Sequence, residues 1–327
     1  MLIAAGRYRR VMPDDPSPAR PDGRGLLILA NSSAGQSVAR LDPLPGIRRR
    51  LPAARVVELG PDDTLDDAVA VAMAGDDPPA VLGVLGGDGS VSRMAHLARR
   101  HDVPLLVLPG GTFNHFARAA GLDDVDTALA AFVDGRVRTV AVAEASTGDG
   151  EPVTVLNAVS LGAYPQFLSE RTRRGNLGKW LGGVVATWRA LRGARPLGIV
   201  HDGRRASVWS VFVSVGRNDP DRHAMMQRAR LADPVLDVRI HHARGSRVRA
   251  MASLAFGRRT IVVLRALRLM PPSSDLERFV EAEWDIDVRP GDAPAVYVHD
   301  GELEEADPAG FTLRVRAVPD ALRVYAP

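Results

Sequence analysis

Short apolar runs alternate with amphipathic segments through the first half of the chain. The apolar runs have the length of strands and lie at 26–30, 55–59, 80–85 and 103–108, whereas helical spacing covers 64–74 and 91–100. Asp66 and Asp67 stand near the start of the first helical segment, where carboxylates favour the positive end of a helix. Strands that alternate with helices predict a parallel sheet covered by helices on both faces.

The pattern changes after about residue 140, where strand-like runs dominate. These runs lie at 153–156, 197–201, 207–215, 236–241, 280–288 and 295–298, and helical patterns cover only 177–192 and 246–256. Turn signals separate several of the runs, among them Asp202-Gly203 and Pro290-Gly291. This half of the chain is therefore predicted to be a mostly antiparallel β domain.

Three regions follow from these patterns. Residues 1–25 are rich in Pro, Arg, Asp and Gly and are expected to form a flexible N-terminal extension. Residues 26–140 are expected to form the α/β domain, and residues 141–327 the β-rich domain, with the extreme C-terminus as a candidate for return to the first domain. A length of 327 residues suits two domains of ordinary size.

Composition excludes several kinds of chemistry. The chain has no Cys, which rules out disulfides, a thiolate nucleophile and Cys-ligated metals. Of its 42 Lys and Arg residues only Lys179 is a lysine, and Trp180 follows it, so there is no Walker A loop. A net charge of +3 and an aromatic fraction of 5% argue against nucleic acid as a partner. No membrane span or signal-peptide pattern is visible, and a cytoplasmic location is expected.

The most informative motif is the run Gly86-Gly87-Asp88-Gly89-Ser90, which lies between a buried strand and a helix. Consecutive glycines allow backbone N–H groups to approach phosphate oxygens, and the following helix start favours anions. An Asp in such a loop repels phosphate unless a cation lies between them, so Asp88 is interpreted as a Mg²⁺ ligand or as a base near the transferred group. A tight turn with a helix-capping Asp is the alternative.

Two further strand ends carry small and polar residues. The strand at 103–108 leads into Pro109-Gly110-Gly111-Thr112-Phe113-Asn114, and the strand at 26–30 leads into Asn31-Ser32-Ser33-Ala34-Gly35. The carboxyl ends of parallel strands are the edge at which open α/β sheets bind ligands. Three such turns together predict a nucleotide-phosphate site that contains no lysine.

With these motifs the sequence resembles the diacylglycerol kinase catalytic domain family, which includes diacylglycerol, sphingosine and ceramide kinases and related bacterial lipid kinases. The matching segments are Asn31–Gly35, Gly86–Ser90, Pro109–Arg118, Leu156–Tyr164, Arg230–Val238, Asp300–Glu302 and the tail from Phe311. The resemblance covers about residues 26 to 327. The two glycine loops at this spacing, followed by a late Asp-Gly-Glu, make it specific.

The resemblance implies a nucleotide-binding α/β domain, a β-sandwich-like second domain and an active site in the cleft between them. It implies ATP and Mg²⁺ as cofactors and a lipid alcohol as substrate. The residues expected at the nucleotide are Asn31, Gly87, Asp88, Gly89, Ser90, Gly111, Thr112, Asn114 and Glu302.

The expected reaction is attack of a lipid hydroxyl on the γ-phosphorus of ATP, with Mg²⁺ held near Asp88. Asp300 is the first candidate for the base and Asp88 the second, and the sequence does not decide between them. Arg173 and Lys179 are candidates to reach the phosphates, with a solvated basic face or contact with anionic lipid as alternatives.

The stripe of Trp180, Val184 and Trp188 fits core packing or a membrane-facing surface. A peripheral position at the inner face of the membrane and the oligomeric state are left open.

Several positions depart from the family pattern. Gln36 follows the first motif where a basic residue is usual, and His115 stands where the second loop usually has Asp. The segment that holds a structural Mg²⁺ in some members has Ala232 and Pro234 here, so no second metal site is predicted. An NAD-kinase-like enzyme with a soluble substrate, or a non-catalytic nucleotide- or lipid-binding regulator, remains the alternative function.

Overall fold

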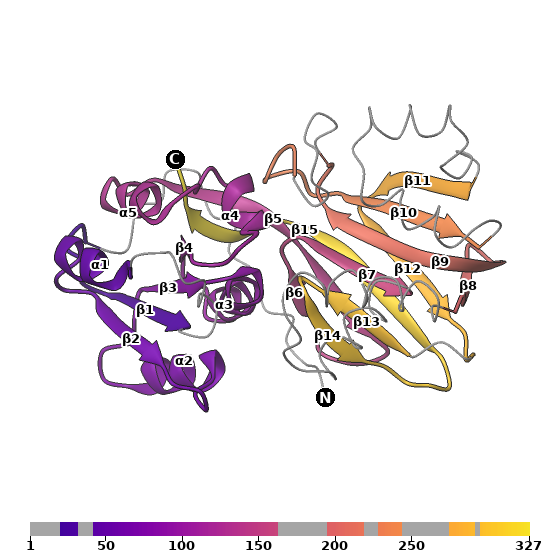
Figure 1. Cartoon of the computed structure of the whole chain (residues 1–327), viewed down its shortest axis with the longest axis horizontal. Coiled ribbons are helices and arrows are strands. Elements are labelled where there is room, and N and C mark those ends of the chain that lie inside the picture. Colours follow the sequence, from indigo (N-terminus) through magenta and orange to yellow (C-terminus); the bar gives the residue numbers. More distant parts are fainter. Residues whose placement is uncertain (1–19, 32–41, 163–194, 219–227, 244–274, 292–294) are drawn as a thin grey trace, which may run out of the picture. The chain divides into compact units, whose positions relative to one another are not determined.

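The computed structural model describes residues 20–31, 42–162, 195–218, 228–243, 275–291 and 295–327, and the chain divides into two compact units (Figure 1). Unit 1 contains the described residues up to Thr112 together with Ala120–Ala141 and Pro319–Pro327. Unit 2 contains Phe113–Ala119 and the described part of Val142–Val318. The chain passes from one unit to the other within two long strands, β5 (Val137–Thr147) and β15 (Phe311–Tyr325).

Unit 1 is built on a parallel sheet. Its strands are β1 (Leu26–Asn31), β2 (Arg55–Leu59), β3 (Val81–Gly86) and β4 (Leu105–Pro109), in the order β2-β1-β3-β4. All three neighbouring pairs are parallel. The C-terminal end of β15 pairs with the other edge of β4, also in parallel, with Val324 opposite Leu105. β3 and β4 are buried along their whole length, which explains their unbroken apolar runs.

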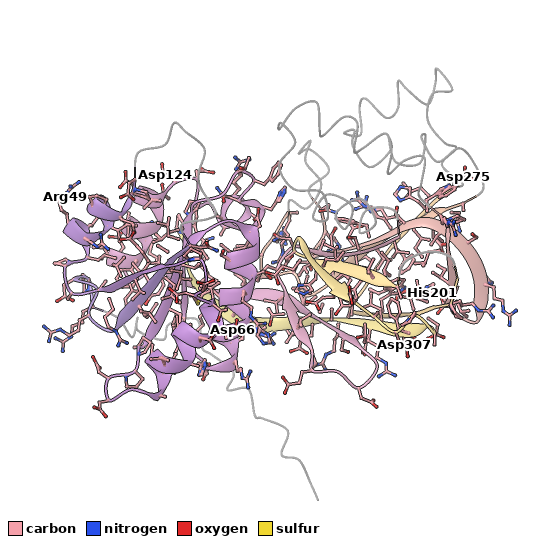
Figure 2. The ribbon with its side chains drawn as sticks, turned by 60° about the horizontal axis from the view of Figure 1, so that its bottom comes forward. Arg49, Asp66, Asp124, His201, Asp275 and Asp307 are labelled. Carbon is pink, nitrogen blue, oxygen red and sulfur yellow. The ribbon has the colours of Figure 1, made fainter. Side chains whose placement is uncertain are left out.

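Helices cover this sheet. They are α1 (Leu44–Arg50), α2 (Leu65–Ala74), α3 (Asp88–Arg100) and α5 (Val125–Val133). Thr64 caps α2 by accepting the N–H of Asp67, and Asp124, labelled in Figure 2, caps α5 by accepting the N–H of Thr127 at 2.7 Å. α3 packs on β3 and beside α2, whereas α5 packs on β4 from the opposite side (Figure 1). The parallel α/β region predicted from the sequence is confirmed.

Unit 2 is mainly antiparallel. Its elements besides the ends of β5 and β15 are α4 (His115–Ala119), β6 (Val153–Val155), β7 (Ala158–Gly162), β8 (Leu197–His201), β9 (Arg204–Val215), β10 (Leu236–His242), β11 (Leu276–Glu281), β12 (Glu283–Val288), β13 (Val296–His299) and β14 (Glu302–Glu305). The long strand β9 pairs with β10 along one edge and with β8 and then β7 along the other. Apolar side chains from nine of these strands form one core, which includes Trp284 and Tyr297.

The single strand expected at 280–288 is wrong. The structure has two strands, β11 and β12, which are separated at Ala282. β11 pairs with β10, whereas β12 pairs with β15 and β8, so the bend at Ala282 lets the chain change partners. The carbonyl of Ala282 accepts the N–H of Ala317 at 2.7 Å, which holds the bend against β15.

Other elements were not predicted, among them α1, α5, β5 and β7. α1 contains Pro45 and Gly46 within seven residues, so its sequence lacks a helical signal. The helices expected at 177–192 and 246–256 lie outside the described residues. Among the described residues, no helix is both long and apolar enough to cross a membrane.

Candidate functional site

The strand order of unit 1 defines where a ligand is expected. From β1 the chain moves outward to β2, and from β3 it moves outward in the other direction to β4, so the direction of winding reverses between β1 and β3. In open α/β sheets, ligands bind beyond the carboxyl ends of the strands at this reversal. β1 ends at Asn31 and β3 ends at Gly86, so two of the predicted motifs lie at this point.

The glycine-rich turn leads directly into a helix start. Gly87 is the N-cap of α3, and the first intrahelical hydrogen bond runs from the N–H of Val91 to the carbonyl of Gly87 at 3.0 Å. The N–H groups of Asp88, Gly89 and Ser90 therefore precede the intrahelical ladder, and all three residues are half-buried. With the partial positive charge of a thirteen-residue helix behind them, these N–H groups favour a bound anion.

Asn31 and Ser90 meet across this turn. The side-chain amide of Asn31 donates a hydrogen bond to the hydroxyl oxygen of Ser90 at 3.1 Å, although the two residues are 59 positions apart. This contact fixes the amide of Asn31 and leaves the Ser90 hydroxyl hydrogen able to donate to another acceptor. The structure thus brings together two motifs that the sequence had predicted to be neighbours.

The second loop lies against the first. The N–H of Gly110 donates to the carbonyl of Gly86 at 2.9 Å. A Cβ atom on Gly110 would lie 3.1 Å from the nitrogen of Gly86, and one on Gly86 would lie 2.8 Å from the Cβ of Ser90. These two glycines are therefore required by the packing of the two turns on each other.

Gly87 differs from these two glycines. A Cβ atom on Gly87 would make only an ordinary contact, 3.6 Å from the Cα of Gly111, and its φ of −87° suits any residue. Neither crowding nor backbone strain in unit 1 calls for glycine at this position. Close approach of a ligand to the backbone is a remaining reason for it.

The other residues of the second loop divide between the units. Gly111 is buried and Thr112 is exposed in unit 1, whereas Asn114 belongs to unit 2. Asn114 is 8% exposed and has a φ of 50°, a left-handed conformation that Asn tolerates better than most residues. Its neighbours Phe113 and His115 stack at 5.6 Å, which gives His115 a structural contact.

In unit 2, Asp300 forms the tip of a hairpin. Asp300 and Gly301 have φ values of 49° and 95° and connect β13 to β14, as Asp-Gly does in two-residue hairpin turns. The Asp300 carboxylate accepts three backbone hydrogen bonds, from Leu156 at 2.6 Å, Asn157 at 2.7 Å and Ala158 at 3.1 Å. These bonds attach the hairpin tip to the segment between β6 and β7.

Arg228 lies beside this tip and was not predicted as a site residue. Its side chain is almost fully buried and donates to the carbonyl of Leu156 at 3.3 Å and to that of Leu231 at 3.0 Å. Burial lowers the pKa of Arg228 to about 10, while the charges of Asp300 and Asp233 act in the opposite direction. The guanidinium is therefore still a cation at neutral pH.

Space for the Arg228 side chain comes from Gly216. This glycine has a φ of 72°, and a Cβ atom there would lie 3.1 Å from the Nε of Arg228. One indirect signal for Arg228 was present, since this residue lies two positions before the Arg230–Val238 match.

Glu302 is half-buried on β14, directly opposite His299 on β13. His299 and Glu304 were not predicted, although the alternation Glu302-x-Glu304 directly after His299-Asp300-Gly301 was a readable signal. The side chains expected at Arg173 and Lys179, the stripe at Trp180, Val184 and Trp188, and residues 32–35 of the first motif lie outside the described residues.

Comparison with known proteins agrees with this geometry. The model of the diacylglycerol kinase catalytic domain matches residues 25–145. Two strains of Pseudomonas aeruginosa have proteins named "Probable lipid kinase YegS-like" that are 30% identical over 260 residues, which is 76% of this chain and 77% of theirs. A crystal structure of a diacylglycerol kinase from Bacillus anthracis has a TM-score of 0.57 at 16% identity and covers 93% of this chain and 97% of its own, which shows the shared fold.

A parallel α/β unit with a glycine-rich turn at its switch point, joined to an antiparallel unit, is therefore a kinase fold. The chain belongs to the diacylglycerol kinase catalytic domain family, together with YegS-like lipid kinases.

Proposed function

We propose that the protein is an ATP- and Mg²⁺-dependent lipid kinase that transfers the γ-phosphoryl group of ATP to a hydroxyl of a lipid alcohol such as diacylglycerol or a sphingoid base. The observation that carries this proposal is the meeting of Asn31 with the Gly86–Ser90 turn at the switch point of unit 1. Kinship with lipid kinases over most of the chain supports the lipid acceptor.

Unit 1 has the groups that phosphate binding requires. The N–H groups of Asp88, Gly89 and Ser90 and the start of α3 supply positive potential, and the Ser90 hydroxyl, held by Asn31, supplies a donor. This arrangement stabilises the charge of a triphosphate without a lysine. Phosphoryl transfer depends mainly on such positioning and charge stabilisation.

Asp88 fits a magnesium ion. It is the first residue of α3 and half-buried, and its carboxylate offers the hard oxygen ligands that Mg²⁺ takes from one or two protein carboxylates and the substrate phosphates. When bound, the ion would neutralise negative charge on the phosphates. Asp88 is also a candidate for the group that orients or deprotonates the acceptor hydroxyl.

We propose that Asp300 positions the hairpin tip, and its expected role as the base that accepts the substrate proton stays a prediction. Its carboxylate accepts three backbone N–H groups that hold the hairpin tip, and since an ionised carboxylate has about four acceptor positions, Oδ2 can still accept a further donor. Glu302 follows on the same hairpin, opposite His299, and its expected place at the nucleotide stays a prediction. Whether this hairpin and the unit 1 turn face a common cleft stays a prediction.

The test is a transfer assay with γ-labelled ATP, Mg²⁺ and mixed micelles that contain diacylglycerol, a sphingoid base or ceramide, with NAD as a soluble acceptor in parallel. The wild type is expected to label one of the lipids, and Asp88→Asn to lower kcat by about 10²–10⁴-fold. Asp62→Asn, an exposed carboxylate of the same unit, is the control and should leave the rate unchanged.

Each other outcome overturns the proposal in a distinct way. Label in NAD alone would identify a soluble-substrate kinase. Binding of ATP without transfer to any acceptor would identify a regulator.

A further inference from the structure

Two buried polar side chains of unit 2 lie on one face of neighbouring strands. β13 pairs with β7 so that His299 lies directly opposite Val159. The pairing of β7 with β9 continues backward to Asn157, whose carbonyl accepts the N–H of Val215 at 2.9 Å. Because side chains alternate along a strand, Asn157 shares the face of Val159 and is the diagonal neighbour of His299. The two polar side chains are therefore within reach of one bound group.

Both side chains have a buried atom without a hydrogen-bond partner among the described residues. These atoms are Oδ1 of Asn157 and Nδ1 of His299, on residues that are 2% and 5% exposed. The other ring nitrogen of His299, Nε2, lies 3.2 Å from Oε1 of Glu304. Native structures contain few buried polar atoms of this kind, and each calls for an explanation such as a bound ligand or an ordered water molecule.

The surroundings of Asn157 sharpen this question. Its neighbours on the same face, Val159, Val213 and Val215, belong to the core of unit 2 and are almost completely buried. Its backbone bonds, to the carboxylate of Asp300 and to Val215, are ones that another residue could also make. Packing alone therefore calls for an apolar side chain such as leucine, and an unpartnered amide at this position lowers stability.

The two unpartnered atoms define the group that fits between them. Oδ1 of Asn157 only accepts hydrogen bonds, so the group must donate. When Nε2–H of His299 donates to Glu304, a second proton on the ring makes Nδ1–H a donor, so the group must also accept. A hydroxyl does both through one oxygen atom. It supplies the acceptor that the buried Nδ1–H lacks, and it leaves the pair of His299 with Glu304 intact.

We propose that Asn157 and His299 together bind a hydroxyl group of the acceptor lipid. The proposal rests on the lipid-kinase function proposed above and adds the side chains that recognise the acceptor. The N–H of Asn157 donates to Asp300 at 2.7 Å, so the hydroxyl would lie near the carboxylate that is expected to accept the substrate proton. An ordered water molecule has the same hydrogen-bonding chemistry, and the experiment separates the two sources.

The experiment measures binding of dioctanoylglycerol and of sphingosine to the full chain in mixed micelles without ATP, each beside its O-methyl ether, which cannot donate from that oxygen. The wild type is expected to bind one alcohol more tightly than its ether. Asn157→Leu should weaken this binding by about tenfold or more, whereas its free energy of unfolding in urea should be unchanged or higher. Ser160→Ala is the control, because Ser160 is buried on the opposite face of β7, and it should leave lipid affinity unchanged.

Two replacements of His299 separate its ring nitrogens. The amide of asparagine takes the place of Nδ1, whereas the amide of glutamine takes the place of Nε2 and still reaches Glu304. His299→Asn should therefore keep most of the lipid affinity, and His299→Gln should lose about tenfold or more.

Two results would overturn the proposal and assign the unpartnered atoms to a water molecule. One is an equal affinity of the wild type for alcohol and ether, and the other is wild-type lipid affinity in both Asn157→Leu and His299→Gln. The lipid-kinase proposal would survive either result if the wild type phosphorylates a lipid. Binding that prefers the alcohol and is lost in both variants, without transfer in the presence of ATP, would support the hydroxyl site and contradict the kinase.

Discussion

At the scale of single residues, Arg228 has the strictest structural requirement, because a charged side chain is buried there. Its guanidinium is buried, donates to two carbonyl oxygens and lies near the carboxylate of Asp300, which itself accepts three backbone N–H groups. The loop between β6 and β7, the hairpin tip and residues 228–233 are thus joined by one cation. The start of the segment that follows Arg228 is therefore held by its bond to the carbonyl of Leu231.

We expect Arg228→Met to lower the free energy of unfolding by about 3 kcal/mol, because two carbonyl oxygens lose a charged donor and the Asp300 carboxylate loses a nearby positive charge. Arg230→Met, two positions further along and exposed, should change it by about 0.5 kcal/mol or less. Urea unfolding followed by circular dichroism measures both. Equal stability of the two variants would show that the buried guanidinium of Arg228 does not stabilise the fold.

A second residue, the buried His241 on β10, should make the free energy of unfolding depend on pH. Burial and then the charges of Arg239 and His242 lower the pKa of His241 to about 4. Because the folded pKa lies below the unfolded value of 6.5, its contribution is fully present above about pH 6.5 and is lost as pH falls toward 4.

Between pH 7 and 4.5 this loss should amount to about 3 kcal/mol. Urea titrations at several pH values measure it, and His241→Gln should flatten the curve in this window. His101→Gln, which replaces an exposed histidine of unit 1, is the control. A wild-type curve with no steeper fall than that of His241→Gln would contradict the expected burial of a neutral imidazole.

At the scale of elements, close approach of strands decides where glycine is needed. Gly162 ends β7 with a φ of 88°, and a Cβ atom there would lie 2.5 Å from the carbonyl oxygen of Trp209 on β9. Gly203, in the turn between β8 and β9, has a φ of 70° but open space around it. Both glycines have a positive φ, but only Gly162 is also crowded by a neighbouring strand.

Gly203→Ala should therefore cost about 1 kcal/mol from left-handed backbone alone. Gly162→Ala should cost at least about 2 kcal/mol more, since β7 and β9 must move apart. Thermal unfolding of both variants compares them directly. A similar loss of stability in the two would mean that β7 and β9 tolerate separation at this end.

Elements were predictable where local signals agreed with tertiary pairing. β3 and β4 are buried on both faces and read as apolar runs, and Thr64 with Asp67 marks the start of α2. The break between β11 and β12 was not predictable, because Ala282 carries no turn signal and the bend is held by the N–H of Ala317 from a distant strand. α1 was missed for the opposite reason, since Pro45 and Gly46 suggest a turn.

The same distinction applies to the site. Three motifs lie at the ends of strands and could be found from their spacing in the sequence: Asn31, Gly86–Ser90 and Pro109–Asn114. Arg228 could not, because its role depends on the fold bringing Leu156, Leu231 and Asp300 around one side chain. The contacts of Asp300 could not be predicted from the Asp-Gly-Glu motif either, because the backbone N–H groups that its carboxylate accepts come from a segment more than 140 residues away in the sequence.

At the scale of the whole molecule, the last residues of the chain complete the first unit. Leu322, Val324 and Tyr325 are almost fully buried, Tyr325 packs on Phe132 of α5 at 4.8 Å, and Val324 pairs with Leu105 of β4. Unit 1 is therefore complete only when residues 319–327 have joined it. Arg99 of α3 also donates to the carbonyl of Ala321 at 3.2 Å.

Tyr325→Ala should destabilise unit 1 by about 3–5 kcal/mol, as expected for loss of a large buried side chain, and should weaken ATP binding in parallel. Leu303→Ala, a partly exposed apolar side chain of β14 in unit 2, is the control and should change ATP affinity little. Isothermal titration and urea unfolding measure the two effects. Unchanged ATP affinity in a destabilised Tyr325→Ala would argue that the nucleotide binds elsewhere.

The central claim is that the turn at the end of β3 binds the phosphates of ATP, and hydrogen exchange measures this most directly. With ATP and Mg²⁺, exchange at the amides of Asp88, Gly89 and Ser90 should slow, because these N–H groups precede the intrahelical ladder and gain acceptors from the phosphates. AMP should protect them much less, and the amides of β2 should be unchanged. Saturating ATP that leaves exchange at 88–90 unaltered would contradict the claim.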